Sequence, residues 1–371
     1  MTCFSYASTR ERDIFYIMKM DIHDPFFLLE KDGKALVFLD SREIGFFEEK
    51  NEQNNLKAIP LEPFYSHIRK QQKKRIESSH LIAAHILKTY VGNGTIEVPA
   101  YFPLDMADFL RRNEFRLKVL KPFVPQRSVK TKTEATAVRL ALKKTQKAFK
   151  TVEKILKGSV IKGKSVIYRG APLTSEILRK AMDKALASEG MFNSEGSIIS
   201  SGIHASMPHH PGSGAIKAGL PIICDLFPVD LSSGYFADMT RTYVKGKPSK
   251  RLNEMYEAVR EAGEKAMSLV KPGVPVRDIH EAVCKILVGK GFDVGDKGFT
   301  HATGHGLGLE VHEAPTVTAS SSAVLEEGNI ITIEPGLYYA KDGGVRIEDV
   351  ALVTKKGHEN MTRYPKRFVI P

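Results

Sequence analysis

The sequence predicts an α/β protein of two domains, the second a pseudo-symmetric sandwich of helices and strands. Three observations support this prediction. The length of 371 residues exceeds that of one ordinary domain. The first part of the chain contains a hairpin signature among strand-like and helix-like segments. After it, an order of two helices followed by strands occurs twice. We therefore expect domains at residues 1–125 and 126–371.

Residues 1–125 are expected to form an independent α/β domain. In DPFFLLEKDGKALVFLD, two apolar runs flank an Asp-Gly pair, which predicts a β-hairpin. Pro122 and Pro125 interrupt the pattern, which places the domain boundary within 122–132. The other expected elements are strands at 57–60 and 95–98 and helices near 64–90 and 105–113.

A long helix is expected to begin the second domain. Thr131 and Glu134 match a capping box, and apolar residues recur at helical steps from Val138 to Leu156. Gly158 can end this helix. The remaining elements, in order, are a helix at 175–189, the strand-like segments SIISSG, PIICDLF and GYFADMTRTYV, helices at 250–270 and 277–289, and the strand-like segments NIITIEPGLYY and GVRIEDVALVT.

Two pairs of carboxylates occupy comparable positions in this repeated order. Asp225 and Asp238 are 13 residues apart on the first strands, and Glu334 and Glu348 are 14 apart on the second. Pseudo-symmetry would bring all four together between the halves. Such a group needs more positive charge than one Lys or Arg supplies. Two divalent ions about 3.5–4 Å apart would neutralise it and supply a hydroxide, so the sequence predicts a hydrolytic dinuclear metal site.

Each carboxylate taken alone has an ordinary alternative. Asp225 could cap a turn before the next proline, and Asp238 could form an ion pair with Arg241. Glu348 stands beside Arg346, as in an exposed salt-bridge ladder. The metal site is favoured because the charges at the ends of apolar strands occur together.

Histidines supply the other polar groups that such a site needs. Three of them lie in HATGHGLGLEVHEAP, and His209 lies in a pair between two prolines. Amide hydrolysis needs donors at the carbonyl and a proton for the leaving nitrogen, and imidazole suits both. We assign His305 as a metal ligand, and His209, His301 and His312 to contacts with the substrate or the ligands. A phosphate loop and a Gly-x-Ser-x-Gly elbow are both missing.

The net charge of +12 raises the possibility of a nucleic-acid surface. The basic residues concentrate at 69–75 and 118–164, where many fall on the polar side of the predicted long helix. No zinc-finger spacing, RNP-like strand or helix-turn-helix accompanies them. We expect a solvated face and no nucleic-acid partner; a non-catalytic binding protein is the competing class.

The composition also bears on the location of the protein. No segment is long and apolar enough to cross a membrane, and charges stand where a signal peptide would be apolar. The three cysteines are widely spaced and odd in number, as expected for reduced thiols. We therefore expect a cytoplasmic protein without membrane partners.

These motifs resemble the aminopeptidase P and prolidase branch of the methionine aminopeptidase, prolidase and creatinase superfamily. TIEPGLYY followed by VRIED carries the likeness, which covers essentially the whole chain. The resemblance implies a creatinase-like N-terminal α/β domain over 1–125 and a pita-bread metallopeptidase domain over 126–371. Because many relatives are dimers, it also implies a homodimer.

The same resemblance implies a role for each site residue. Glu334 would take a proton from the metal-bridging water. His209 and His312 would hold the scissile carbonyl or relay protons, His301 would line a proline pocket, and Arg346 would orient the ligands by an ion pair. The metal ligands it implies are Asp225, Asp238, His305, Glu334 and Glu348.

One motif departs from the family pattern. The family writes Asp-x-Gly with 11 residues to the second aspartate, whereas here Asp225-Leu-Phe-Pro and a gap of 13 imply a longer hairpin. Asp230 within it could be mistaken for a ligand. All five ligands are present, which argues against a creatinase activity and a pseudoenzyme.

Two substrates are compatible with this resemblance. Aminopeptidase P removes the first residue from peptides with proline in second position, whereas prolidase cleaves Xaa-Pro dipeptides. A dipeptidase needs a cation for the proline carboxylate, and prolidases place an Arg between the ligand His and the first ligand Glu. Residues 299–334 contain no Arg or Lys. This favours an Xaa-Pro aminopeptidase, with the Xaa-Pro dipeptidase (prolidase) as the alternative if another part of the chain or a second subunit supplies the cation.

The ligand set also bears on the metal. Four of the five expected ligands are carboxylates, which suits manganese, while the affinity order favours cobalt or zinc. We expect two divalent ions, with manganese first and cobalt or zinc as alternatives.

Overall fold

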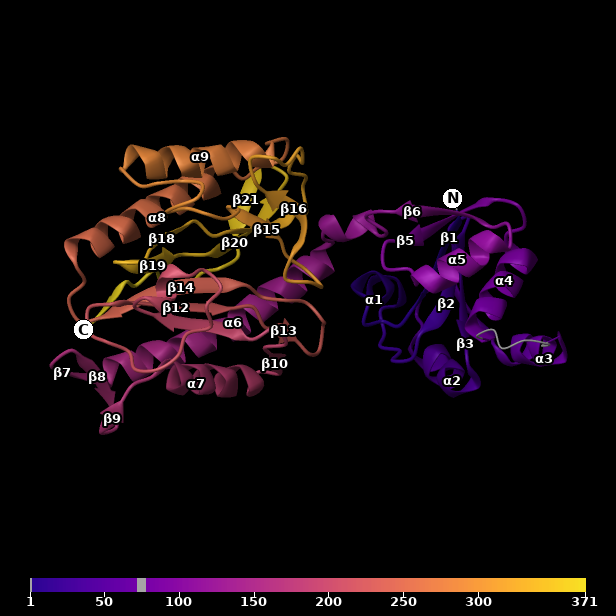
Figure 1. The fold of residues 1–371 in the computed structure, drawn as a ribbon, viewed down its shortest axis with the longest axis horizontal. Helices are drawn as coiled ribbons and strands as arrows, with labels where there is room; N and C mark the ends of the chain where they lie inside the picture. The colour runs from indigo at the N-terminus through magenta and orange to yellow at the C-terminus, as the bar shows by residue number, and fades with distance from the viewer. Residues whose placement is uncertain (1, 72–77) are drawn as a thin grey trace. The chain divides into compact units, whose positions relative to one another are not determined.

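The chain divides into two units, residues 1–127 and 128–371, each of which has its own sheets (Figure 1). This computed structural model describes residues 2–71 and 78–371. The predicted boundary between residues 125 and 126 falls in the 3₁₀ turn η1, Pro125–Ser128. The elements of the first unit are β1 Thr2–Ala7, α1 Arg12–Met18, β2 Phe26–Lys31, β3 Lys34–Leu39, α2 Ser41–Lys50, β4 Leu56–Pro60, α3 Glu62–Gln71, α4 Ser78–Tyr90, β5 Thr95–Pro99, α5 Leu104–Arg112 and β6 Arg116–Leu120.

The first unit is built on one mixed sheet with the strand order β4-β3-β2-β1-β5-β6. The predicted hairpin is confirmed as β2 and β3, and Asp32 and Gly33 in its turn have φ of 52° and 76°. Successive residues of β2 point to opposite faces. Phe27 packs with α3, α4 and α5, and Leu28 packs with α1 and α2. Both faces of the sheet are therefore buried under helices.

The described parts of the predicted helical segment 64–90 are α3, up to Gln71, and α4, from Ser78. Residues 72–77 between them, with most of the basic stretch 69–75, lie outside the described residues. The predicted strands at 57–60 and 95–98 and the helix at 105–113 correspond to β4, β5 and α5.

The second unit opens with the predicted long helix. The capping box is confirmed, because the Thr131 hydroxyl accepts from the Glu134 amide and the Glu134 carboxylate accepts from the Thr131 amide. The elements of this unit after η1 are α6 Lys132–Lys157, β7 Val160–Lys162, β8 Ser165–Tyr168, β9 Ala171–Pro172, α7 Ser175–Ala187, β10 Met191–Phe192, β11 Ser197–Ser201, η2 His204–Ser206, β12 Pro221–Leu226, β13 Val229–Asp230, β14 Met239–Lys245, α8 Lys250–Leu269, α9 Val276–Gly289, β15 Gly304–Gly306, β16 Glu313–Val317, β17 Ile330–Ile333, β18 Gly336–Tyr339, β19 Gly343–Arg346, β20 Asp349–Thr354, β21 Gly357–Asn360 and β22 Val369–Ile370.

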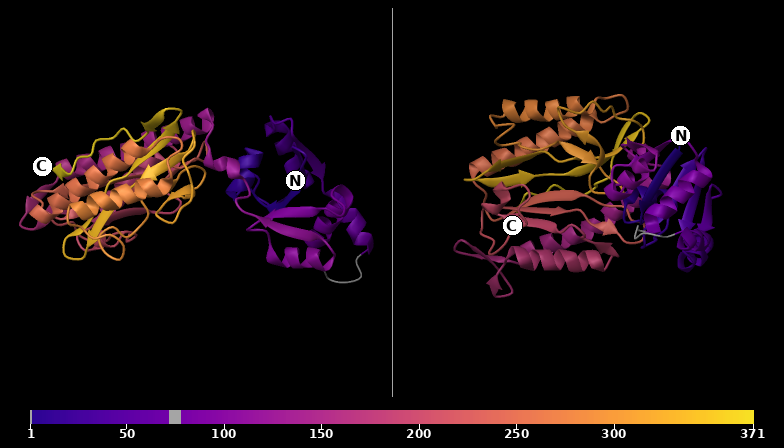
Figure 2. Two further views of the ribbon diagram at one scale, coloured as in Figure 1. Left: turned by 90° about the horizontal axis from the view of Figure 1, so that it is seen from above. Right: turned by 45° about the vertical axis from the view of Figure 1, so that its right-hand side comes forward.

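The second unit has the mixed α/β sandwich that the repeated order predicts. One sheet has the order β11-β12-β14-β22, and another has the order β16-β15-β17-β20-β21. Helices α6 and α7 lie on one outer side of the strands, and α8 and α9 lie on the other (Figures 1 and 2). The largest apolar core packs α8 and α9 against the second sheet. On α6, the predicted solvated face is confirmed by exposed lysines, namely Lys143, Lys147, Lys150, Lys154 and Lys157.

Three of the predicted ligands, Asp238, Glu334 and Glu348, stand just outside strands. NIITIEPGLYY is not one strand, because β17 ends before Glu334 and β18 begins after Pro335, which has no N–H for the ladder. GVRIEDVALVT likewise breaks at Glu348, between β19 and β20. Asp238 directly precedes β14, so the predicted strand over GYFADMTRTYV is shorter than expected. These interruptions release the ligand side chains from the regular alternation of a strand.

The capping box gives a test of how α6 anchors the second unit. Thr131→Ala removes the acceptor for the Glu134 amide, so we expect the free energy of unfolding to fall by about 1 kcal/mol. For a chain of this size, the midpoint of thermal unfolding should fall by about 2–4 °C.

Thr136→Ala is the matched control, because this exposed hydroxyl donates to the Lys132 carbonyl inside the helix and caps nothing. Equal midpoints for the two variants, measured by circular dichroism, would contradict the capping role.

Candidate metal centre

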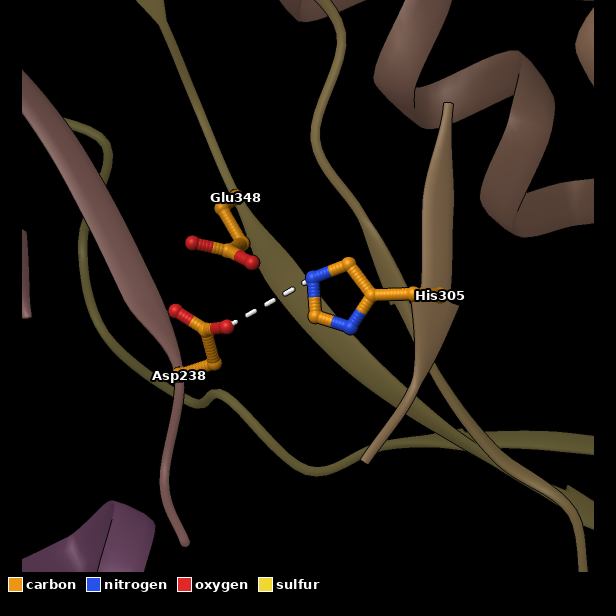
Figure 3. A group of neighbouring side chains, drawn as sticks. All are labelled: Asp238, His305 and Glu348. Atoms are coloured by element: carbon orange, nitrogen blue, oxygen red, sulfur yellow. Dashed lines mark ion pairs between the residues drawn. The ribbon is translucent and has the colours of Figure 1, made fainter. Parts of the chain in front are cut away.

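Three predicted ligands converge from different parts of the second unit (Figure 3). Asp238 precedes β14, His305 is the middle residue of β15, and Glu348 lies between β19 and β20. One ligand atom from each lies within 4.8 Å of the other two, and all three side chains are buried. In the part of the chain that the structure describes, this is the one group of three or more such residues.

His305 is oriented so that one ring nitrogen faces the carboxylates. Its Nδ1 lies 3.1 Å from the Gly306 carbonyl oxygen, which fixes Nδ1 as the donor. Its Nε2 then faces Asp238 at 3.7 Å and Glu334 at 3.2 Å. This arrangement presents Nε2 as a metal ligand and adds Glu334 to the group.

Asp225 joins the site through an ion pair. Its Oδ2 accepts from the Arg346 guanidinium at 2.6 Å, and both side chains are buried. Its other oxygen, Oδ1, is buried and has no hydrogen-bond partner among the described residues. A buried carboxylate oxygen without a partner is costly, so Oδ1 is chemically suited to a cation.

The pKa values show that the negative charge is not balanced by the protein. Burial and the neighbouring carboxylates raise the pKa of Asp238 and of Glu348 well above their ordinary values. Burial opposes the charged forms of Glu334 and His305, but their hydrogen bond and mutual charge lower the pKa of Glu334 to about 2 and raise that of His305 to about 9. Divalent cations would remove this imbalance, so the residues present fit a metal site made mostly of oxygen donors.

Arg346 connects the carboxylates to His301. Its guanidinium donates to the Tyr338 hydroxyl at 2.7 Å, and that hydroxyl lies 2.9 Å from His301 Nε2. His301 Nδ1 donates to the Ala302 carbonyl, and burial lowers the pKa of His301, so the ring is neutral and accepts from Tyr338. The chain of hydrogen bonds fixes both Asp225, a predicted ligand, and the ring of His301.

A cavity of about 590 Å³ opens onto these residues. His209 and His312 line it together with the five predicted ligands, and the rings of His312 and His305 are 4.3 Å apart between centroids. Burial lowers the pKa of His312. The structure thus brings all of the predicted site residues to one cavity, namely His209, Asp225, Asp238, His301, His305, His312, Glu334, Arg346 and Glu348.

The ordinary alternative for Asp238 does not occur. Arg241 forms its ion pair with Asp349, at 2.8 Å, and not with Asp238. Asp230, which could have been mistaken for a ligand, instead pairs with Lys144 at 2.7 Å. The extra residues of the hairpin are therefore held away from the ligand group.

Sequence reasoning missed several residues that hold the ligands. The Thr240 hydroxyl donates to Glu348 at 2.9 Å, and the Thr332 hydroxyl accepts from the His305 amide at 3.0 Å. Both threonines stand two residues from a predicted ligand, on strands buried on both sides. The signal available in the sequence was a threonine within an apolar strand, two residues from a predicted ligand. Tyr338 had no such signal, because GLYY reads equally well as core.

The comparisons agree with this geometry. Residues 136–355 match the model of metallopeptidase family M24. The chain belongs to metallopeptidase family M24. It is 30% identical over 351 residues to an uncharacterized peptidase of Staphylococcus aureus (strain MW2). The aligned region covers 91% of this chain and 88% of that protein.

Solved structures with the same fold include two peptidases of other organisms. The prolidase from Pyrococcus horikoshii OT3 superposes with a TM-score of 0.78 and 25% identity, over 98% of this chain and 94% of that one. The X-Pro aminopeptidase from Thermotoga maritima MSB8 gives a TM-score of 0.77 with 22% identity, over 99% and 97% of the two chains. The second unit is thus the pita-bread fold of a peptidase. None of the described helices has the length and apolarity needed to cross a bilayer.

The raised pKa values predict how metal binding depends on pH. Without metal, His305 holds a proton below about pH 9, and the raised pKa values of Asp238 and Glu348 also favour their protonated forms, so apparent affinity for Mn²⁺ should rise with pH until about pH 9. Calorimetry in two buffers of different ionisation enthalpy should show proton release.

Asp238→Asn should weaken Mn²⁺ binding by at least tenfold, an estimate on the order of the loss of one ligand. Asp296→Asn is the control, because this carboxylate is exposed and outside the cavity. Affinity independent of pH, or equal affinity for the two variants, would count against the site.

Proposed function

We propose that this peptidase is an Xaa-Pro aminopeptidase that removes the first residue from peptides with proline in second position. Two divalent ions, manganese first and cobalt or zinc as alternatives, would be held by the five predicted ligands, Asp225, Asp238, His305, Glu334 and Glu348. The proposal is supported by the fold, which this chain shares with the X-Pro aminopeptidase from Thermotoga maritima.

The observation that carries the choice of substrate is the lack of an available cation. Arg346 is the one Arg or Lys among the described residues that line the cavity. Its guanidinium is already bound to Asp225 and Tyr338. A dipeptide such as Xaa-Pro would therefore bring a carboxylate into a cavity where no uncommitted Arg or Lys of the described lining can receive it, whereas a longer peptide brings a neutral amide.

Bound divalent ions would supply Lewis acidity and an activated water for amide hydrolysis. The protein's own residues would do the rest. The Glu334 carboxylate lies beside His305 and can accept a proton from the attacking water. His209 and His312 would contact the carbonyl oxygen and deliver a proton to the proline nitrogen, which must leave as an amine. His301, held by Tyr338, would contact the proline ring.

Prolidase activity is the alternative. It is supported by the similarity to the prolidase from Pyrococcus horikoshii, which shares 25% of its residues with this chain. Under that alternative, the cation for the proline carboxylate would come from outside the described lining of the cavity.

Cleavage of defined peptides separates the two activities. Chelator-treated protein is assayed with Ala-Pro and Ala-Pro-Ala after addition of Mn²⁺, Co²⁺ or Zn²⁺. We expect metal-restored cleavage of the tripeptide, with kcat/KM for the dipeptide lower by about tenfold or more, because no uncommitted Arg or Lys of the described lining pairs with its carboxylate. Preference for the dipeptide would establish the prolidase, and cleavage of neither by metal-loaded protein would rule out both.

Glu334→Gln tests the role of this side chain as the proton acceptor. Glutamine keeps the shape and one ligand oxygen but cannot accept the proton, so kcat should fall by about 10²–10⁴-fold. Metal content of the variant is measured alongside by atomic emission. Full activity with the same metal content as the wild type would exclude the assigned role.

A further inference from the structure

Glu195 differs from every other carboxylate of the cavity. It lies in the turn between β10 and β11 and lines the cavity, yet its side chain is exposed. The four predicted ligand carboxylates are far less accessible, with side-chain exposures of 11% for Asp225, 5% for Asp238 and 17% for Glu334, and Glu348 is 2% exposed overall. Glu195 therefore marks the solvent end of the cavity, and the ligand group marks its closed end.

The charge of Glu195 is not matched by the protein. Its side chain makes no hydrogen bond or ion pair among the residues that the structure describes. Its charge acts on His312 across the cavity, where it opposes the effect of burial, which lowers the pKa of that ring. The rim thus carries one uncompensated negative charge.

The direction of a bound peptide follows from this polarity. The substrate α-amine is cationic and the scissile carbonyl must reach the predicted ligands, so the first residue occupies the closed end. The chain then runs outward through proline at no more than about 3.6 Å per residue. The group that follows the proline is the one that approaches the rim. In a dipeptide that group is a carboxylate, and in a tripeptide it is the third residue.

Ser197 provides a second observation on the same path. It is 7% exposed and lines the cavity two residues after Glu195, and its buried hydroxyl has no hydrogen-bond partner among the described residues. Buried hydroxyls are normally satisfied, so this one is available to a ligand. A peptide group passing between the ligand residues and Glu195 would satisfy it.

We propose that Glu195 is a specificity-determining residue that selects peptides with a basic third residue and rejects a free carboxylate after the proline. The preferred substrates are Xaa-Pro-Arg and Xaa-Pro-Lys peptides, and Ser197 hydrogen-bonds the backbone of the leaving segment. This proposal rests on the proposed function, because it assumes that proline occupies the second position.

The test compares kcat/KM for Ala-Pro-Arg, Ala-Pro-Ala and Ala-Pro-Glu with Mn²⁺-loaded protein. An exposed charge pair changes binding by about two- to fivefold, so the wild type should prefer the Arg peptide over the Glu peptide by about tenfold. Glu195→Gln should reduce this ratio to about twofold or less, and Glu195→Arg should invert it. High salt should reduce the wild-type ratio, because the site is exposed.

Glu327→Gln is the matched control. This glutamate is exposed, belongs to the same unit and does not line the cavity, so the ratio should equal that of the wild type. An unchanged ratio in Glu195→Gln, with all three peptides cleaved, would overturn the specificity role and leave the proposed function standing.

A binding measurement separates the two proposals. Pro-Arg, Pro-Ala and Pro-Glu are the leaving segments of these peptides, and their binding to Mn²⁺-loaded protein needs no turnover. Calorimetry should give the affinity order Pro-Arg, Pro-Ala, Pro-Glu for the wild type and a weaker order for Glu195→Gln. Equal affinities, or no binding of any of the three, overturn the role of Glu195. Failure of the proposed function appears separately, as no cleavage of any Xaa-Pro peptide.

Discussion

Mutual repulsion among four clustered carboxylates, three of them buried, is the constraint on which the rest of the second unit depends. Asp225, Asp238, Glu334 and Glu348 share one cavity, and Arg346 is the single Arg among the described residues that line it. The protein assembles this group by taking one acidic pair from each half of a sandwich, so that neither half carries the whole charge. The carboxylates repel one another where the two halves meet. Divalent cations provide the opposite charge at that point, which makes metal binding part of the stability of the closed unit.

The supports around the ligands explain how the group keeps its geometry. Arg241 is 1% exposed and donates to the Glu348 carbonyl at 2.6 Å and to the Tyr364 carbonyl at 2.9 Å. Arg241, which lies in β14, therefore connects this strand to the backbone at the predicted ligand Glu348. The same strand directly follows the predicted ligand Asp238. Breaks in the strands let the predicted ligand side chains point where the regular alternation of a strand would not place them. Hydrogen bonds from hydroxyl groups such as that of Thr240 hold these side chains in place. A site held by buried strands is more rigid than one on loops, and this suits a catalytic centre. The rim, in contrast, is a turn with an exposed glutamate, where substrate preference can change without disturbing the metal ligands.

Much of this site could be predicted from the sequence, because its predicted ligands stand at the ends of strongly apolar strands. An ionised group there is costly unless a partner balances its charge. The capping box of α6 and the Asp-Gly hairpin were local signals of the same kind. What could not be predicted depends on tertiary pairing. The break of one predicted strand at Glu334 divides it between two sheets, and only the fold decides that. Helices α1 and α2 were not expected either, since their apolar periods are short. Glu195 lies in a turn with no pattern of its own, so its place at the cavity rim required the structure.

The most direct measurement of the central claim is electron paramagnetic resonance of Mn²⁺-loaded protein together with the number of ions bound per chain. Two ions held by shared carboxylates should give two Mn²⁺ per chain and a spectrum of exchange-coupled spins, and Asp238→Asn should lose the coupling. One ion per chain, or the six-line spectrum of isolated Mn²⁺, would contradict the claim that these carboxylates form a dinuclear centre.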